Sequence, residues 1–572
     1  MNILGLSFHC YDTAACLLKN NELVAFVEEE RLNRIKHSES IFPIKSLQFC
    51  LEKGNIKFSD IDCIAYGFDT MKYSNGYMRK FYDSINFKKD VRTLKWENDN
   101  INLFSHDNIK EFIQSNLIKI GVFDKIPPIK SYSHHLSHAA SSYYCSGFDE
   151  AITITMDGSG DDHSTVLWNC NNDSINEIKS KKIPHSLGWL YASITEYLGF
   201  HANNCEGKVM GLAPYGKSIN DIELAFDKLI NIGDGDYSIN PNYLFYGKHS
   251  FNDRFTDMFV DLMSIPPKTE DRGLFSGYEN IAFTLQNRLE DCIIELTKGL
   301  IIDTGIKNLC LSGGVALNCK ANGRIWKECD LDNIFIQPIS SDAGVSLGAA
   351  LLCQKDKGVS PKIRFSNVYL GPEYSDDEIE GYLINCKLKY RKIRSPSKLA
   401  AELLDQGKII GWFQGRMEAG PRSLGSRSIL ADPRKIEMKD KINNEVKFRD
   451  PWRPFCPSVL EDYSHEYFEN NYYHPFMIMA FDVKVDKCDK IPAVVHIDNT
   501  ARPQMVRKDE NEKYYRLIKH FYSLTSVPVV LNTSLNIKGE PIVCSPRDAI
   551  KCFFGTGLDA LIIGNFILTK YN

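Results

Sequence analysis

The sequence predicts an α/β protein with at least two domains. The chain has 572 residues, 43% hydrophobic and 25% charged, an ordinary globular composition and more residues than one hydrophobic core usually serves. Short apolar runs repeatedly end in acidic or glycine-rich turns, several of which open a helix-like segment. Apolar periodicity is lost around residues 354–361, so we expect a domain junction there.

The first elements of the chain recur in outline further along. Residues 3–8 predict a strand, followed by a turn with Asp12, a strand over 13–18, an Asn-rich turn and a third apolar run over 23–27. Residues 151–156 lead in the same way into Asp157, a strand over 164–168, an Asn-rich turn and a third short strand. Two such units resemble the paired halves of the actin and sugar-kinase fold, which hold nucleotide phosphates from two sides.

A histidine pair precedes the second unit. His134 and His138 are four residues apart, so on a helix they share one face and can bind one ion, with Asp157 at the end of the following strand as a further ligand. A pair at this spacing is more often a surface or core feature. The pair alone therefore does not establish a metal site.

Two more strand ends and one loop carry candidate ligand-binding groups. A buried strand over 309–311 opens into Ser312-Gly313-Gly314 and Asn318, where glycines allow close backbone approach and free N–H groups at a helix start favour phosphate. A strand over 334–336 runs into Asp342, the natural fourth metal ligand. Between these units, Lys208 and Gly211 lie in a glycine-punctuated segment over 206–216, which an ordinary surface loop would also explain.

The second half is rich in arginine within turn-like sequence. Arg422 and Arg427 stand among glycines and serines, and Asn443, Lys447, Arg449 and Arg453 follow, then Arg502. Arginine held in turns suits bidentate binding of phosphate or carbamate oxygens. An interface salt-bridge network is the alternative. A strand over 527–531 ends at Asn532 and Ser534, a polar turn suited to an anion or nucleotide.

Composition narrows the class of protein. Seventeen cysteines, an odd number without a C-x-x-C pair, indicate free thiols in a reducing cytoplasm. The first residues lack a signal-like pattern and no apolar run is long enough to span a bilayer, so we expect no targeting segment and no membrane partner. A net charge of -5 gives no electrostatic reason to expect nucleic acid.

The motifs that carry a family resemblance run in order over nearly the whole chain. In the first half they are 12–15, 28–37, His134 with His138, Asp157-Gly158, 208–213, 312–314 and Asp342. In the second half they are 420–425, 453–455, 502–504 and 532–534. On these motifs the chain resembles the O-carbamoyltransferase family of the NodU, CmcH and TobZ type.

The resemblance implies two modules. Residues 1–358 would form an actin-like, duplicated module similar to TsaD, the threonylcarbamoyl transferase of tRNA modification. Residues 362–572 would form an α/β module similar to YrdC, which makes carbamoyl adenylates. The second module would convert carbamoyl phosphate and ATP to carbamoyl adenylate, and the first would transfer the carbamoyl group to a hydroxyl of a small-molecule acceptor. A sugar or an antibiotic or other secondary metabolite is such an acceptor.

The resemblance also implies roles for single residues. His134, His138, Asp157 and Asp342 would hold a divalent metal, with iron(II) favoured by the family, although manganese, magnesium and zinc also suit such donors. Carbamoyl phosphate would be bound by Lys447, Arg449, Arg502, Asn532 and Ser534, supported by Arg422 and Arg427. The nucleotide would contact a set of small and polar residues, namely Gly158, Gly160, Lys208, Gly211, Gly313, Gly314 and Asn318.

One departure from the family leaves the general base open. Many relatives place a histidine immediately before the Asp12 position, where this chain has Tyr11, with His9 two residues earlier. The base for the acceptor hydroxyl would then be Tyr11, His9 or His37, and a tyrosine needs a lowered pKa for that task. The candidate catalytic residues are therefore Tyr11, Asp12, His37, Lys208, Lys447 and Arg449.

Two other functions are compatible with parts of the pattern. A TsaD-like enzyme acting on tRNA would keep the first module but would not need the arginine-rich second one. A non-catalytic nucleotide-binding module would keep the glycine turns but could lose metal ligands, and all four are present. The sequence specifies neither the acceptor nor the oligomeric state, and a homodimer is compatible with it.

Overall fold

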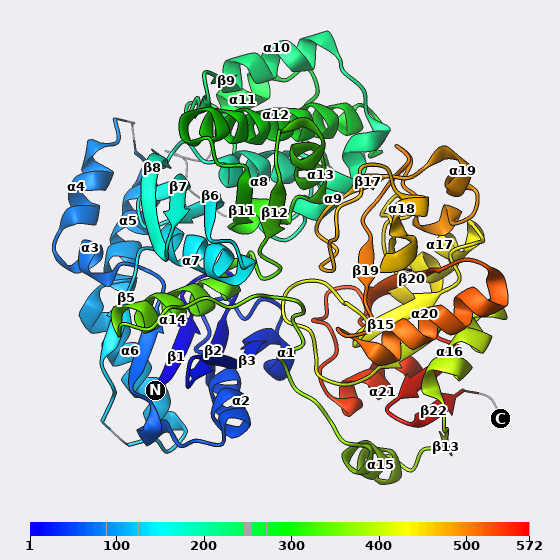
Figure 1. Cartoon of the computed structure of the whole chain (residues 1–572). Coiled ribbons are helices and arrows are strands. Elements are labelled where there is room, and N and C mark those ends of the chain that lie inside the picture. Colours follow the sequence, from blue (N-terminus) through cyan, green and yellow to red (C-terminus); the bar gives the residue numbers. More distant parts are fainter. Residues whose placement is uncertain (87–88, 124, 245–253, 270–272, 571–572) are drawn as a thin grey trace. The chain divides into compact units, whose positions relative to one another are not determined.

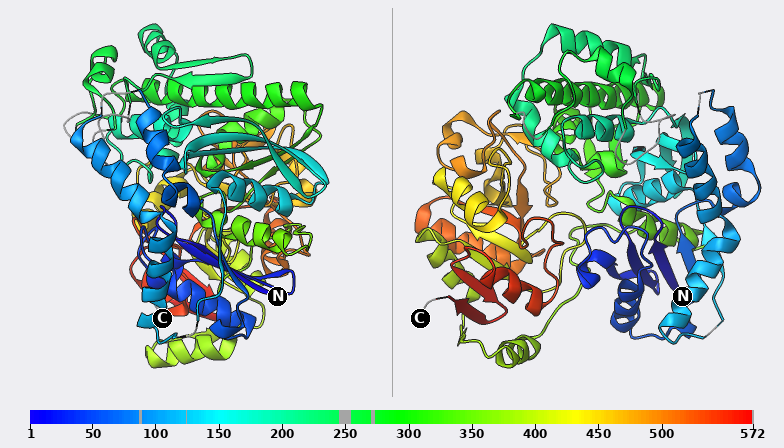
Figure 2. Two further views of the ribbon diagram at one scale, coloured as in Figure 1. Left: turned by 90° about the vertical axis from the view of Figure 1, so that its left-hand side faces the viewer. Right: turned by 180° about the vertical axis from the view of Figure 1, so that it is seen from behind.

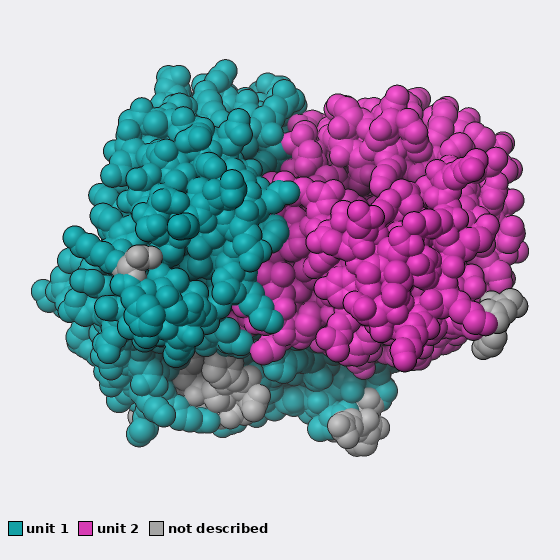
Figure 3. All heavy atoms as spheres, turned by 90° about the horizontal axis from the view of Figure 1, so that it is seen from below, with its two compact units in different colours: residues 1–25, 39–365 teal, residues 26–38, 366–572 magenta. Residues whose placement is uncertain are grey.

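The computed structural model describes the chain except residues 87–88, 124, 245–253, 270–272 and 571–572 (Figure 1). The chain forms two compact units (Figure 3). The N-terminal unit contains residues 1–25 and 39–365, and the C-terminal unit contains residues 26–38 and 366–572. No helix in the described part of the chain combines the length and apolar character that crossing a membrane requires.

The N-terminal unit contains two sheets of the same topology. The first has the order β3-β2-β1-β4-β5, in which β1 is antiparallel to β2 and parallel to β4. The second has the order β8-β7-β6-β11-β12, in which β6 is antiparallel to β7 and parallel to β11. The strands of the first sheet are β1 (Asn2–Ser7), β2 (Ala14–Lys19), β3 (Glu22–Glu28), β4 (Cys63–Tyr66) and β5 (Ile129–Ser131). Those of the second are β6 (Glu150–Gly160), β7 (His163–Asn171), β8 (Ser174–Lys182), β11 (Asn308–Ser312) and β12 (Asn333–Ile336). The repeated order confirms the α/β class and the duplicated, actin-like architecture that the sequence predicted.

One helix follows the last strand of each repeat and crosses to the other sheet. Helix α7 (His134–Ser146) follows β5 and packs on β6, β7 and β11. Helix α14 (Val345–Asp356) follows β12 and packs on β1, β2 and β4. The two helices also pack on each other (Figure 1). At this contact a Cβ atom at Gly348 would lie 1.7 Å from the Ser137 carbonyl oxygen. Small residues are therefore needed where the two repeats meet.

Helices between the strands complete the N-terminal unit. Four of them stand between β4 and β5, namely α3 (Thr70–Ser74), α4 (Tyr77–Ser84), α5 (Val91–Leu103) and α6 (His106–Lys119). The second repeat carries α8 (Leu187–Tyr197), α9 (Glu206–Leu212), α10 (Asn220–Leu229), the long α12 (Tyr278–Thr304) and α13 (Cys319–Glu328). Helix α12 packs against α8, α9, α10 and α13, so it joins these insertions to the second sheet (Figure 2).

The C-terminal unit is built on one mixed eight-stranded sheet. Its order is β13-β22-β21-β14-β15-β20-β16-β19. The central strands are β14 (Ile410–Phe413), β15 (Arg427–Ala431), β20 (Val529–Ser534) and β16 (Cys456–Leu460), flanked by β19 (Gln504–Val506) and β21 (Ala560–Ile563). Beyond β21 lie β22 (Phe566–Thr569) and the edge strand β13 (Arg391–Lys392). Helices α16 (Pro396–Asp405) and α20 (Glu512–Thr525) pack together, and α20 also covers β16 and β20. The arginine-rich turns therefore leave or enter the central strands of this sheet.

Residues 26–38 form a strap that packs with the C-terminal unit, which departs from the single boundary expected near residues 358–362. The strap contains the end of β3 and helix α1 (Glu29–Asn33). The Arg31 guanidinium contacts Glu30 at 2.6 Å and Glu28 at 3.6 Å, and donates to the Gly420 carbonyl at 2.9 Å. Glu28 accepts from the Gly420 N–H at 2.7 Å. The buried ion pairs lie within the strap and hold its side chains in place, and the two hydrogen bonds with Gly420 fix the strap against the 420–425 turn.

Candidate functional site

Four side chains meet at one edge of the second sheet of the N-terminal unit. His134 and His138 lie one turn apart on α7, Asp157 lies near the end of β6, and Asp342 follows β12. One ligand atom from each residue lies within 4.8 Å of every other. The His138 Nε2 is 3.1 Å from an Asp157 carboxylate oxygen, and the His134 Nε2 is 3.6 Å from Asp342. The structure therefore brings together all four residues that the sequence singled out as metal ligands.

The other ring nitrogens of the two histidines are already bonded. His134 Nδ1 lies 3.2 Å from the Gly67 carbonyl, and His138 Nδ1 lies 3.2 Å from the Ser312 hydroxyl. Asp161 accepts a hydrogen bond from the His134 backbone N–H at 2.9 Å, which holds the start of α7. Partners on Nδ1 orient an imidazole so that Nε2 faces the cluster, as metal-binding histidines require.

Each carboxylate is shared between a backbone N–H and the histidines. Asp157 accepts from the Gly158 N–H at 2.7 Å, and Asp342 accepts from the Tyr11 N–H at 3.2 Å. Burial would raise the pKa of Asp157, but hydrogen bonds with His134 and His138 hold it well below its usual value. Burial, and then the Asp157 charge, raise the pKa of Asp342. Two acids this close favour a cation between them.

Gly160 is required by the packing of His134. A Cβ atom at this position would lie 2.0 Å from Cδ2 of the His134 ring, so no larger residue fits without moving the ring. We expect Gly160→Ala to lower the divalent-metal content of the purified protein by at least about 10-fold, because misplaced ligands lose affinity. Metal analysis after dialysis measures this, with Gly233→Ala as the control, since nothing lies near its Cβ. Wild-type metal content in the Gly160 variant would contradict the placement of His134.

The glycine turn after β11 faces the same cluster. Gly313 has a left-handed φ of 92°, and a Cβ there would lie 2.1 Å from the Met156 carbonyl. A Cβ at Gly314 would lie 3.1 Å from an Asp157 carboxylate oxygen. Gly158 packs against Trp189. The structure therefore places Gly158, Gly313 and Gly314 beside Asp157.

Asn318 and Lys208 lie on other helices of this repeat. Asn318 caps α13 through a bond from the Ala321 N–H at 3.1 Å, and its amide pairs with Gln286 at 2.9 and 3.0 Å. These bonds give the Asn318 side chain a structural task. Lys208 lies on α9 with its ammonium 5.1 Å from the centre of the Phe200 ring, and Gly211 is buried in the same helix.

The candidate bases belong to different units. Tyr11 and Asp12 lie in the turn after β1, and burial raises the pKa of Tyr11, whereas a base needs a lower one. Burial lowers the pKa of His9 to about 4, and its ring packs 4.2 Å from that of Phe112, so His9 is neutral at pH 7. His37 lies in the strap of the C-terminal unit, and its backbone N–H donates to the Glu30 carboxylate at 2.6 Å.

The C-terminal unit gathers positive charge around Arg449. Its Nε donates to the Asn443 side-chain oxygen at 2.9 Å, and its guanidinium lies 4.4 Å from the centre of the Phe455 ring. Burial, and then the charges of Arg453 and Arg502, lower the pKa of Arg449 to about 9. Arg502 donates to the Cys456 sulfur at 3.0 Å. Like charges held together in this way are characteristic of an anion site.

Lys447 and Ser534 adjoin this positive cluster. Burial, and then the Arg449 charge, lower the pKa of Lys447. The Lys447 ammonium donates to the Ser534 hydroxyl at 3.2 Å and to the Asn536 side-chain oxygen at 2.7 Å, and it also contacts both backbone carbonyls. Lys447 therefore organises the polar turn after β20.

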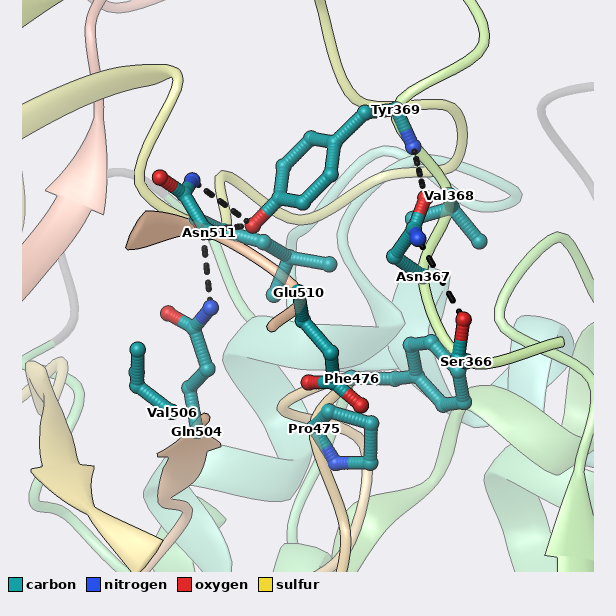
Figure 4. Close-up of a pocket in the computed structure, with 11 residues that line it drawn as sticks. Ser366, Asn367, Val368, Tyr369, Pro475, Phe476, Gln504, Val506, Glu510 and Asn511 are labelled. Carbon is teal, nitrogen blue, oxygen red and sulfur yellow. Dashed lines mark hydrogen bonds between the residues drawn. The ribbon is translucent and has the colours of Figure 1, made fainter. Parts of the chain in front are cut away.

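Asn532 connects that turn to a polar pocket. Its amide nitrogen donates to the Ser423 carbonyl, the Ser458 hydroxyl and the Gln504 side-chain oxygen at 3.0–3.1 Å. Gln504 lines the pocket together with Tyr369, Phe476, Glu510 and Asn511 (Figure 4). Within it, the Asn511 amide donates to the Tyr369 hydroxyl at 3.0 Å.

The two arginines of the 420–428 turn are used differently. Arg422 is half-buried. Arg427 is fully buried, and its guanidinium donates to the carbonyls of Gln414, Gly415, Ser426 and Pro372 while stacking 3.7 Å from the centre of the Phe413 ring. Arg427 therefore holds the chain around β14 and β15, a task that arginine in a turn does not reveal in the sequence.

Sequence reasoning did not assign two further polar residues. Asp161 supports α7 beneath His134, and Asn443 supports Arg449. An acidic residue after Gly160 and an Asn directly after the helix at 437–442 are both common in turns and caps. No local signal separated them from such residues.

Comparisons with known proteins agree with this arrangement. The family model described as "Carbamoyltransferase N-terminus" matches residues 2–351, and the one described as "Carbamoyltransferase C-terminus" matches residues 401–570. The nodulation protein NolNO of Sinorhizobium fredii is 37% identical over 98% of this chain and 79% of its own length. The uncharacterized protein sll1178 of Synechocystis is 35% identical over 100% of this chain and 97% of its own length.

Solved structures align with only part of the chain. Full-length HypF in a phosphate- and nucleotide-bound form covers 63% of this chain and 56% of HypF at 14% identity, with a TM-score of 0.32. That score is too low for any conclusion about function. The two family models and the relatives above cover most of the chain, and on them the chain belongs to the carbamoyltransferase family and is a transferase of carbamoyl groups.

Proposed function

We propose that the protein is an ATP-dependent carbamoyltransferase that works in two stages. Carbamoyl phosphate is first hydrolysed to carbamate and phosphate. A carbamate oxygen then attacks the α-phosphate of ATP, which gives carbamoyl adenylate and releases pyrophosphate. Finally an acceptor hydroxyl attacks the carbamoyl carbon, AMP leaves, and the hydroxyl proton passes to a base.

The buried positive cluster of the C-terminal unit carries this proposal. Arg449 has its pKa lowered to about 9 by burial and by the charges of Arg453 and Arg502, so the isolated site is destabilised by repulsion. A bound phosphate dianion would remove that repulsion, and fixed guanidinium donors in a buried site stabilise anionic oxygens strongly. We assign activation of carbamoyl phosphate to Arg449, Lys447 and Arg502, with Ser534, Asn532 and Arg422 around them.

The cluster of His134, His138, Asp157 and Asp342 fits a divalent cation. Two imidazole nitrogens and two carboxylates form a mixed donor set that suits iron(II), which the family resemblance favours, and also manganese or zinc, with magnesium the least suited to nitrogen donors. A bound cation would supply charge neutralisation for phosphate or carbamoyl oxygens. We assign the nucleotide part of the adenylate to the backbone of Gly313 and Gly314, which lie beside Met156 and Asp157, with Gly158, Gly160 and Lys208 in the same repeat.

We assign the transfer stage to the N-terminal unit. Asp12 and Tyr11 lie in one turn, and the Tyr11 N–H donates to Asp342 at 3.2 Å, so an acceptor hydroxyl bound near Asp12 would lie close to the ligand cluster. The acceptor is proposed to be the hydroxyl of a sugar or another small natural product. Because burial raises the pKa of Tyr11, this residue is unsuited as the base, and among the remaining candidates His9, His37 and Asp12 we assign the task to Asp12.

Formation of the adenylate without an acceptor tests the proposal. Purified protein incubated with ATP, carbamoyl phosphate and a divalent metal is expected to release pyrophosphate and to form carbamoyl adenylate, detected by a coupled assay and by mass spectrometry. Omission of carbamoyl phosphate is the control and should prevent pyrophosphate release. If neither product forms in the complete mixture, the two-stage mechanism is wrong.

A further inference from the structure

A π-helix brings Asn443 against Arg449. The π-helix spans Asn443–Lys447, and such segments are rare and often occur at functional sites. Phe448 follows with a left-handed φ of 48°, an unusual conformation for a bulky residue. With this conformation at Phe448, the backbone N–H groups of Phe448 and Arg449 both donate to the Asn443 carbonyl, that of Arg449 at 3.3 Å. Asn443 therefore anchors the segment that carries Arg449.

The Asn443 side chain also fixes one edge of the guanidinium. Arg449 Nε donates to Asn443 Oδ1 at 2.9 Å, and Nη2 donates to the Pro454 carbonyl at 3.4 Å. Phe455 covers a face of the guanidinium. No hydrogen bond joins Nη1 to any residue that the structure describes. Nη1 is therefore the nitrogen that this packing leaves for a ligand.

The amide nitrogen of Asn443 is a second free donor. Asn443 is 1% exposed, and within the described part of the chain its Nδ2 has no hydrogen-bond partner. A buried donor without a partner is unfavourable, so such groups usually bind a ligand or a water molecule. Lys447 and Arg449 make this region positive, so an anionic oxygen is the complementary partner.

We propose that Asn443 has two tasks in substrate binding. Through Oδ1 it positions the guanidinium of Arg449, and through Nδ2 it donates directly to the oxyanion that Arg449 binds. That oxyanion is the phosphate group of carbamoyl phosphate, an identification that rests on the function proposed above. The π-helix is then the device that places both groups in one site.

Two variants at position 443 separate these tasks. Asn443→Ala removes both contacts, and we expect the KM for carbamoyl phosphate to rise by about 10- to 100-fold, the value of a hydrogen bond to a charged group, while the KM for ATP stays within about 2-fold. Asn443→Asp keeps an oxygen for Arg449 Nε but loses the donor and adds a negative charge, so its KM should rise at least as much. Asn444→Ala is the matched control, because Asn444 lies in the same π-helix and is exposed.

Binding of inorganic phosphate, measured by calorimetry, gives a readout independent of turnover and should weaken in parallel. An unchanged KM and unchanged phosphate binding in Asn443→Ala would overturn the proposal, and wild-type values in Asn443→Asp would overturn direct donation by Nδ2. If the wild type forms no adenylate but binds phosphate more tightly than Asn443→Ala does, the proposed function is wrong and the oxyanion site is supported. A thermal unfolding midpoint within a few degrees of the wild-type value confirms that a variant is folded. If Asn443→Ala does not fold, the nearly isosteric Asn443→Asp still tests the proposal.

Discussion

Replacing Arg449 with alanine is expected to lower pyrophosphate release from ATP and carbamoyl phosphate by at least about 100-fold, whereas His138→Ala retains it. The first effect follows because Asn443 and Pro454 position the Arg449 guanidinium and leave its Nη1 for the anion, and losing one preorganised donor to a developing charge costs about 100- to 1,000-fold. The second follows because His138 lies in the N-terminal unit, within the cluster that we assign to transfer.

A coupled pyrophosphate assay without acceptor measures the first stage. Transfer is measured after an acceptor has been identified by screening. If transfer is blocked, carbamoyl adenylate accumulates in the presence of that acceptor, and mass spectrometry detects it. Arg449→Lys keeps the charge but loses the planar fork, so it should remain at least about 10-fold impaired. The controls are Arg394→Ala and His520→Ala, both at exposed positions of the C-terminal unit. Loss of pyrophosphate release in both Arg449→Ala and His138→Ala would contradict the division of labour.

Replacing Arg31 with alanine is expected to destabilise the C-terminal unit by about 3–5 kcal/mol, the cost of breaking a buried ion pair from one side. Arg31 is 4% exposed and contacts two buried acids, Glu28 and Glu30. Burial already raises the pKa of Glu28, and Arg31 is the charge that opposes that rise. Without Arg31, the strap would lose its attachment to Gly420 as well as its charge balance.

Denaturant unfolding of the full chain, followed by a probe in the C-terminal unit such as the buried Trp412, measures this change. Arg516→Ala is the matched control, because Arg516 pairs with Glu512 at 2.7 Å on the surface of the same unit, with both side chains more than half exposed. An exposed pair of this kind contributes less than about 1 kcal/mol. An equal, small effect in both variants would show that residues 26–38 do not stabilise the C-terminal unit.

The fold was largely predictable because it is built from local patterns. Buried strands such as β1 and β6 are short apolar runs, and each ends in a turn whose residue types demand a change of direction. The repeated strand and turn pattern predicted the duplication, which the two sheets of identical order confirm. The boundary of the second unit was not predictable in this way, because the strap contacts the rest of the C-terminal unit through tertiary hydrogen bonds with Gly420 that leave no periodic signal.

By itself the sequence determined the residue types of the site, their positions at strand ends and helix starts, and the family. His134 and His138 share a helix face because they are four residues apart, and an acidic residue that follows a buried strand lies at the edge of the sheet. Only the tertiary structure decided which partners the long polar side chains of the C-terminal unit contact. In the structure the Arg427 guanidinium donates to backbone carbonyls, and the Asn443 side chain accepts from Arg449. The physical reason is that local pattern specifies the conformation of a segment, whereas the partner of a long polar side chain depends on segments far away in the chain.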